Sequence, residues 1–249
     1  MPRPLLRAIL FDFGGTLMHG RSAWEPFVAQ ADEALTRYLC SQGIELNLNT
    51  FPTEFRKRLD QYFLRREKDL YETTYAFVLR ELLQEKGYAN VPDKTIRSAL
   101  DALFAVTQSN WELEPDAIPT LKRLEEAGYR LGIVSNAGDD DDVQQLARKF
   151  NLHPYFDFIL TSAACNYRKP HPRIFQLALA FWNYSPQEVA MVGDNLHADI
   201  FGAQNAGLYG IWLSRRADPK MEEQVRVRPD ASLDSLSELP SILDRLQIE

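Results

Sequence analysis

Short apolar runs rich in β-branched and aromatic residues recur along the chain, and most of them alternate with segments that have the apolar spacing of helices. The runs expected to form strands are residues 8–11, 130–134, 156–160, 189–192 and 209–213. The segments expected to form helices around the later strands are residues 117–127, 142–150, 172–181 and 198–206. Strands that alternate with helices in this way are typical of a parallel sheet covered on both faces. The sequence therefore predicts an α/β fold with a doubly wound parallel sheet.

The interval between the first strand and the rest of the sheet, residues 17–116, has a different pattern. It contains no convincing strand, and its apolar residues recur at helical spacing in residues 24–38, 53–70, 75–83 and 94–104. Gly43, Pro52 and Pro92 break this pattern, and residues 114–116 mark the return to the alternating pattern. We therefore expect an all-helical cap subdomain at residues 17–116, inserted into a core of residues 1–16 and 117–249.

The insertion is rich in aromatic side chains. Aromatic residues at helical spacing are packing residues more often than pocket residues. We therefore expect them to pack in the core of the insertion itself; they are Trp24, Phe27, Tyr38, Phe55, Tyr62, Phe63, Tyr71, Tyr75 and Phe77.

Composition and charge exclude several classes of protein. A chain of 249 residues with 45% hydrophobic residues is long enough for a large core, and it has no apolar run long enough to cross a membrane. Its net charge of −7 indicates no general attraction to nucleic acid or anionic lipid. Cys40 and Cys165 lie far apart, which suits a reducing compartment, and Asp12 interrupts the apolar start of the chain that would otherwise resemble a signal peptide. We expect a cytoplasmic protein that binds a small molecule, with neither nucleic acid nor membrane as partner, and we make no prediction of its oligomeric state.

Polar residues follow the expected strands at the points where these strands end. Asp12 follows the first strand, the pair Ser135-Asn136 follows the second, and Lys169 comes after the third. Asp194 ends the fourth strand, with Asp199 five residues further on. Ligands of open α/β sheets bind beyond the carboxyl ends of the strands. We therefore expect these side chains to converge on one site.

These residue types suit the transfer of a phosphoryl group to a side chain. A carboxylate attacks phosphorus only if the repulsion between two anions is relieved, and a Mg²⁺ ion and a lysine both relieve it. Asp12 would attack and also bind the metal, and Asp194 and Asp199 would hold Mg²⁺ directly or through water. Ser135 and Lys169 would hold the phosphoryl group.

Four motifs in this order resemble those of the haloacid dehalogenase-like hydrolases: residues 12–16 (DFGGT), Ser135, Lys169, and Gly193-Asp194 with Asp199. The resemblance implies a Rossmann-like core and a cap that contributes substrate specificity. It also implies that Asp12 is the nucleophile, that the segment Ser135-Asn136 and Lys169 bind the phosphate, and that Asp12, Asp194 and the backbone carbonyl of Gly14 bind Mg²⁺.

The first motif departs from the family pattern at Gly14. Phosphatases of the family usually carry a second aspartate there, which protonates the leaving group and then activates water. Glycine keeps a carbonyl for the metal and the substrate site but deletes this acid/base group, a loss that typically costs 10² to 10⁴ in rate. The enzyme would then be slow or restricted to good leaving groups, another base such as His19 would replace it, or the protein would bind phosphorylated ligands without turnover. On this basis, Gly14→Asp is expected to raise turnover.

Other reactions of the family fit less well. Its dehalogenases need no metal and carry tyrosine at the position of Gly14, so the presence of Asp194 and Asp199 argues against them. Its phosphonate-cleaving members have alanine there, but they use a cap lysine near the position where this chain has Arg21. Phosphonate cleavage therefore remains an alternative ranked below phosphate ester hydrolysis.

Three further patterns have simpler explanations. Residues 15–22 differ from a phosphate-binding P-loop at one position, because Arg21 stands where the P-loop requires lysine. The acidic run 139–142 is expected to begin a helix, where negative charge is favourable, and not to bind a second metal. His171 and His197 have no partner at ligand spacing. We therefore predict a Mg²⁺-dependent phosphatase acting on a small phosphorylated metabolite, with a non-catalytic phospho-ligand-binding protein as the alternative.

Overall fold

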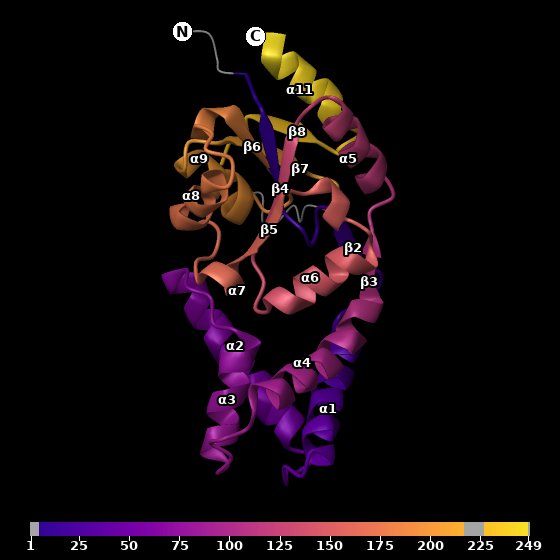
Figure 1. Ribbon diagram of the computed structural model, residues 1–249, viewed down its shortest axis with the longest axis vertical. Coiled ribbons are helices and arrows are strands. Elements are labelled where there is room, and N and C mark those ends of the chain that lie inside the picture. The colour runs from indigo at the N-terminus through magenta and orange to yellow at the C-terminus, as the bar shows by residue number, and fades with distance from the viewer. Residues whose placement is uncertain (1–4, 217–226, 249) are drawn as a thin grey trace.

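The computed structural model describes residues 5–216 and 227–248, which form two parts (Figure 1). A sheet with helices around it forms the upper part in this view, and the helices α1 to α4 form the lower part. The chain passes from the sheet into the lower part after its first strand and returns before its second.

The sheet has six parallel strands in the order β5-β4-β1-β6-β7-β8. Their bounds are Ala8–Phe11 (β1), Arg130–Ser135 (β4), Phe158–Thr161 (β5), Val189–Gly193 (β6), Tyr209–Leu213 (β7) and Ala231–Leu233 (β8). All five expected strands are confirmed, and their ends move by two residues at most. The short β8 was not expected, because three residues at the sheet edge carry too little pattern to indicate a strand.

Helices cover both faces of the sheet, which confirms the doubly wound architecture. On one face, Ile9 and Phe11 pack with α5 (Ala117–Glu126), α6 (Asp140–Lys149) and α11 (Leu239–Ile248). On the other face, Ala8 and Leu10 pack with α8 (Pro172–Ala180) and α9 (Gly202–Asn205). Since successive side chains of a strand point to opposite faces, β1 is buried on both sides and forms a continuous apolar run.

The segment expected as a helix at residues 198–206 begins as a π-helical turn. This turn spans Leu196–Phe201 and continues directly into α9. Asn195 begins it, because its side chain accepts hydrogen bonds from the backbone N–H groups of His197 and Ala198. Wide turns of this kind occur frequently at functional sites, and this one carries Asp199.

The lower part contains four helices with a hydrophobic core of their own. They are α1 (Glu25–Ser41), α2 (Phe51–Asp69), α3 (Tyr75–Glu85) and α4 (Asp93–Thr107). Leu35, Phe55, Leu79 and Leu100 are fully buried between them. This cluster lies among residues of the insertion alone, so the insertion buries its own apolar surface.

The two ends of the insertion form a short antiparallel ribbon. Its strands are β2 (Met18–Gly20) and β3 (Trp111–Leu113). The expectation that residues 17–116 contain no strand is therefore wrong at both ends. A three-residue strand with His19 and Gly20 in it has neither an alternating pattern nor strong β-formers, so only its pairing reveals it.

Two smaller expectations are also tested by the fold. Within the described residues, no helix combines the length and apolar character needed to cross a bilayer. Cys40 and Cys165 are free thiols, and each sulfur lies near a backbone carbonyl in its own neighbourhood, that of Leu46 or Tyr167. Both cysteines are therefore partly buried free thiols.

Candidate active site

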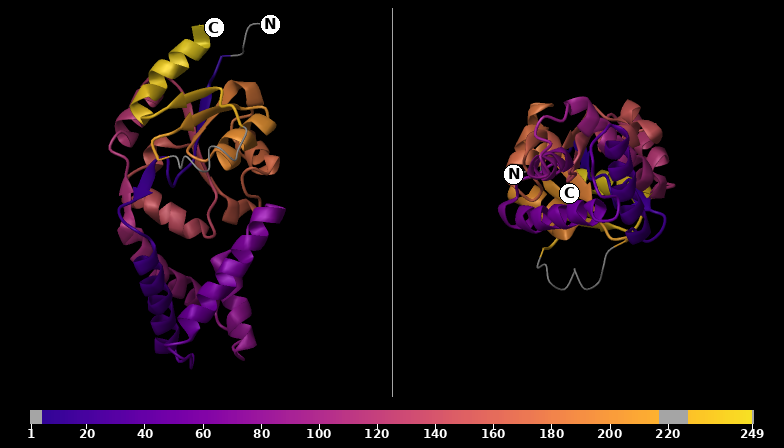
Figure 2. Two further views of the ribbon diagram at one scale, coloured as in Figure 1. Left: turned by 180° about the vertical axis from the view of Figure 1, so that it is seen from behind. Right: turned by 90° about the horizontal axis from the view of Figure 1, so that it is seen from below.

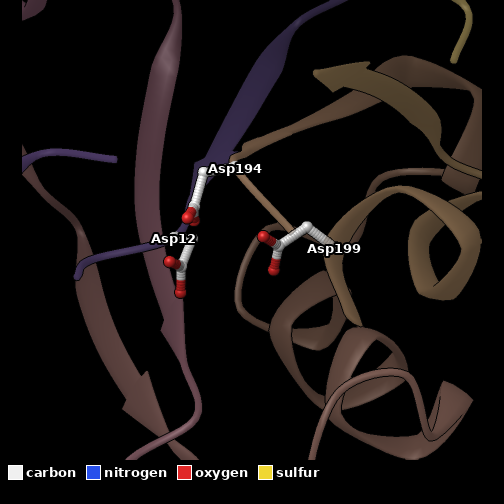
Figure 3. Close-up of side chains that lie close together, drawn as sticks. All are labelled: Asp12, Asp194 and Asp199. Carbon is white, nitrogen blue, oxygen red and sulfur yellow. The ribbon is translucent and has the colours of Figure 1, made fainter. Parts of the chain in front are cut away.

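Three carboxylates meet at the carboxyl edge of the sheet (Figure 3). Asp12 directly follows β1, Asp194 directly follows β6, and Asp199 lies in the π-helical turn. One oxygen from each lies within 4.8 Å of the others, and this is the only such cluster of three potential metal ligands among the described residues. The centre of the sheet therefore brings together residues separated by most of the chain.

Lys169 lies against this cluster and is almost completely buried. Its Nζ lies 2.6 Å from Oδ1 of Asp12 and 2.7 Å from Oδ1 of Asp199, and it donates a hydrogen bond of 2.7 Å to the carbonyl of Val134. Burial alone would lower the pKa of Lys169, but the charges of Asp12 and Asp199 outweigh burial and raise this pKa above its ordinary value. The lysine is therefore a fixed cation beside Asp12.

The cluster carries more negative charge than one lysine compensates. Burial, followed by the charges of Asp12 and Asp199, raises the pKa of Asp194 to about 7. Burial also raises the pKa of Asp199, to about 6, although Lys169 opposes this shift. Oxygen ligands that repel one another in this way are a donor set that a hard divalent cation would stabilise.

Two glycines allow the backbone to approach these carboxylates. A Cβ atom on Gly15 would overlap the Asp194 carboxylate, and a Cβ atom on Gly193 would overlap that of Asp199. Gly15 also has a φ of +89°, which disfavours any other residue. The packing around the three carboxylates therefore fits a small cation held between them.

The structure places the remaining predicted residues around the same point. Ser135 ends β4 and is buried, and Gly14 lies in the loop after β1. The side chain of Asn136 exchanges two hydrogen bonds with the backbone of Lys169: Nδ2 donates to its carbonyl at 2.9 Å, and Oδ1 accepts from its N–H at 2.7 Å. Asn136 thus positions the lysine loop, a role that its place in the sequence did not indicate.

A cavity of about 800 Å³ opens above these residues, between the sheet and the insertion. The sequence-predicted residues form its floor: Asp12, Gly14, Ser135, Asn136, Lys169, Asp194 and Asp199. The insertion contributes an aromatic wall: Trp24, Phe63, Tyr75, Phe104 and Trp111. The prediction of a packing role is confirmed for Phe63 and Tyr75, which pack against the core of the insertion but also line the cavity. It is wrong for Trp24, which precedes α1 and lines the cavity.

One corner of the insertion is joined to the core by a buried ion-pair cluster centred on Glu72. Its carboxylate lies 2.8 Å from Nη1 of Arg66, pairs with Arg168, and accepts a hydrogen bond of 2.6 Å from Ser162. Backbone hydrogen bonds join the same segments: the N–H of Glu72 donates to the carbonyl of Asn166, and the N–H of Arg168 donates to that of Leu70. Seen from behind, α2 runs from the far end of the insertion up to this junction (Figure 2). Arg168, which directly precedes Lys169, is thereby joined to the insertion.

Removal of the central carboxylate is expected to destabilise the protein strongly. Glu72→Ala leaves the partly buried Arg66 and the buried Arg168 without their shared partner, and we expect a loss of about 3 kcal/mol in the free energy of unfolding. Glu67→Ala is the matched control, since Glu67 also pairs with Arg168 but is 67% exposed, and it should cost less than about 1 kcal/mol. Urea unfolding of both variants measures the difference, and equal losses would show that burial of Glu72 is irrelevant.

The acidic run 139–142 begins α6, as expected. Asp139 caps this helix by accepting a hydrogen bond of 3.0 Å from the N–H of Asp142, and both of its oxygens lie 2.8 Å from Nη1 of Arg97 on α4. Asp142 accepts a hydrogen bond from Gln108, and burial raises its pKa to about 7. The run therefore provides a second junction between core and insertion.

The three histidines singled out in the sequence have different surroundings. His19 lies in β2 and lines the cavity, and its Nδ1 is 3.0 Å from Oε1 of the buried Glu114. His171 caps α8 by accepting from the N–H of Arg173. His197 lies in the π-helical turn, stacks on Phe201 and also lines the cavity.

The structure agrees with the rejection of a P-loop at residues 15–22. A P-loop leads directly into a helix, whereas this segment contains β2, and α1 begins only at Glu25. Arg21, which stands where the P-loop lysine would be, is 62% exposed and lies 3.8 Å from Glu112.

Comparison with known proteins agrees with this geometry. A family model described as haloacid dehalogenase-like hydrolase matches residues 6–207. The chain is 25% identical over 240 residues to the glyceraldehyde 3-phosphate phosphatase of Pyrococcus furiosus, an alignment that covers 96% of this chain and 94% of the relative.

Two solved structures extend the similarity to the whole fold. A HAD phosphatase from Thermococcus onnurineus is 27% identical, with a TM-score of 0.66 and coverage of 96% of this chain and 98% of that one. A 2-haloacid dehalogenase from Pseudomonas syringae is 25% identical, with a TM-score of 0.68 and coverage of 97% and 99%. The motifs at the strand ends and these matches lead to one conclusion: the chain belongs to the haloacid dehalogenase-like hydrolases.

Proposed function

We propose that this protein is a Mg²⁺-dependent phosphatase that hydrolyses a small phosphorylated metabolite through an aspartyl-phosphate on Asp12. The observation that carries the proposal is the position of Asp12, which lies on the cavity floor beside a buried lysine and two further carboxylates. Relatives with phosphatase names, such as the glyceraldehyde 3-phosphate phosphatase of Pyrococcus furiosus, support the reaction class.

Each residue of the site has a role in this proposal. Asp12 attacks phosphorus, while Ser135 and Lys169 hold the phosphoryl oxygens and Asn136 keeps the lysine in place. Asp12, Asp194, Asp199 and the carbonyl of Gly14 are the ligands that would hold Mg²⁺, directly or through water. When bound, the ion would reduce the repulsion between the attacking carboxylate and the phosphate.

The helical insertion, residues 17–116, acts in this proposal as a cap over the core of residues 1–16 and 117–249. It closes the cavity with aromatic side chains and would exclude water from the reaction. The two-stranded ribbon β2–β3 is the connection about which it would move. Substrate selection then depends on side chains of the cap.

Dehalogenation is the second candidate, because a solved 2-haloacid dehalogenase has the same overall fold and Gly14 supplies no acid/base group. One observation favours the phosphatase over the dehalogenase. The carboxylate cluster fits a divalent cation, which dehalogenases do not need. Phosphonate cleavage also ranks below the phosphatase, since the exposed Arg21 pairs with Glu112 and does not line the cavity.

A release assay distinguishes these functions. We expect phosphate release from at least one member of a panel of phosphate monoesters in the presence of Mg²⁺, and loss of that release on addition of EDTA. The same panel includes phosphonates and 2-haloacids, with halide release measured separately. Binding of a phosphate analogue such as vanadate with no turnover of any compound would favour the non-catalytic alternative instead.

The metal affinity is expected to fall as the pH falls. Because Asp194 has a pKa raised to about 7 without metal, protons compete with Mg²⁺ below that pH. The deprotonated form predominates at pH 8 and the protonated form at pH 6, so the apparent Kd should rise about tenfold between these values. Calorimetric titration with Mg²⁺ at both pH values measures this change. An unchanged Kd would show that Asp194 does not take part in metal binding.

A further inference from the structure

A tryptophan ring lies where the side chain of residue 14 would extend. A Cβ atom built on Gly14 would lie 3.0 Å from Cη2 of Trp111, closer than nearly all real contacts of this kind. Trp111 belongs to β3, which pairs with β2. The strand β2 in turn follows the loop that carries Asp12 and Gly14, and Gly14 forms a β-bridge with Met18 of β2. The indole and the glycine are therefore a packed pair beside the proposed nucleophile.

A second contact between a glycine and a tryptophan, that of Gly20 with Trp24, lies beside the Trp111 ring. A Cβ atom on Gly20 would lie 2.9 Å from Nε1 of Trp24, and the rings of Trp24 and Trp111 are 4.8 Å apart between centroids. Both tryptophans line the cavity that contains Asp12. Because an indole neither gives nor accepts a proton near neutral pH, the two rings packed beside Gly14 supply no general acid there.

From this arrangement we infer that the packed pair of Gly14 and Trp111 leaves the reacting phosphate without a general acid. The enzyme is thereby restricted to leaving groups that depart as stable anions without being protonated, as in aryl and acyl phosphates. The inference rests on the proposed phosphatase function. It replaces the expectation that Gly14→Asp alone raises turnover, since the new side chain would meet the Trp111 ring.

The reaction balances without a general acid for such substrates. A carboxylate oxygen of Asp12 forms a bond to phosphorus, and the bond from phosphorus to the leaving oxygen breaks with both electrons going to that oxygen. Water then forms a bond to phosphorus, the bond to Asp12 breaks, and the protons of water leave with inorganic phosphate and the solvent. An alkoxide is too basic to leave in this way, and a missing general acid costs about 10² to 10⁴ in rate.

The test compares leaving groups on the wild-type enzyme with Mg²⁺. The series consists of 4-nitrophenyl phosphate, phenyl phosphate, acetyl phosphate and glycerol phosphate, and kcat/KM is measured because it reports on the first chemical step. We expect kcat/KM for glycerol phosphate to be at least about 10²-fold below that for 4-nitrophenyl phosphate. The kcat/KM values for acetyl phosphate and the two aryl phosphates then show whether the enzyme acts better on acyl or on aryl phosphates.

Two variants test whether the missing acid at the Gly14–Trp111 pair is the cause. Trp111→Ala combined with Gly14→Asp introduces a carboxylate into the space vacated by the ring, and it should reduce the difference between alkyl and aryl phosphates at least about tenfold. Trp111→Ala alone is the matched control and should leave that difference unchanged. Circular dichroism of both variants verifies folding, and the wild-type series decides the inference even if either variant fails to fold.

Other outcomes separate this inference from the proposed function. Equal kcat/KM values for alkyl and aryl phosphates, with release that depends on Asp12, would overturn the inference and leave the phosphatase intact. If His19→Gln then restored the steep dependence, His19 would be the acid, which also overturns it. Absence of phosphate release from every compound would instead count against the proposed function.

Discussion

Replacement of Asp12 by Asn is expected to abolish phosphate release. The amide keeps the size of the side chain but removes the nucleophilic oxygen and one ligand of the carboxylate cluster. Since loss of a nucleophile removes nearly all of the chemical step, we expect kcat to fall at least about 10⁴-fold. The measurement is phosphate release with Mg²⁺ on the best substrate of the panel.

Folding of this variant should be retained, because the change also removes one of three mutually repelling carboxylates. Asp140→Asn is a suitable control: Asp140 lies in the first turn of α6, where it accepts a hydrogen bond from Thr161, and it does not line the cavity. We expect its kcat to stay within about threefold of the wild type. Activity of Asp12→Asn near the wild-type value would refute the assignment of the nucleophile.

Replacement of Lys169 by Met is expected to have the second largest effect. The change keeps an unbranched side chain but removes the cation that lies 2.6 Å from Asp12 and 2.7 Å from Asp199. A charged group that stabilises the phosphoryl oxygens is worth about 10² to 10³ in kcat, and we expect a loss of at least that size. Steady-state kinetics measures this loss.

Metal binding gives a second readout for the same lysine. Without Lys169 the three carboxylates lack their buried cation, so Mg²⁺ should raise the melting temperature of Lys169→Met more than that of the wild type. Lys122→Met, at an exposed position of α5, is the control and should change neither kcat nor the effect of Mg²⁺. An identical effect of Mg²⁺ on all three proteins would contradict the electrostatic role of Lys169.

The parts of the fold that the sequence predicted are those with a strong local pattern. The central strand β1 is buried on both faces and therefore appears as an uninterrupted apolar run that ends at Asp12. The helices of the insertion have enough turns for their apolar stripes to be recognised. The ribbon β2–β3 and the edge strand β8 have three residues each, and they exist as strands only because a partner lies beside them.

The same distinction applies to the candidate site. Asp12, Ser135, Lys169 and Asp194 were predictable because each lies at the end of a strand or in the segment after one, and parallel strands end at one edge of the sheet. The ion pair between Glu72 and Arg168 joins residues 96 positions apart and has no local signature. The contact of Trp111 with Gly14 likewise depends on how the end of the insertion folds back over the first loop.

The most direct test of the proposed reaction is a search for phosphate on Asp12. The protein is mixed with Mg²⁺ and an excess of its best substrate, quenched in acid within a turnover, and digested for peptide mass spectrometry. We expect phosphate on the peptide that contains Asp12, and none when the mixture contains EDTA. Continuous phosphate release with Asp12 unmodified at every quench time would contradict it.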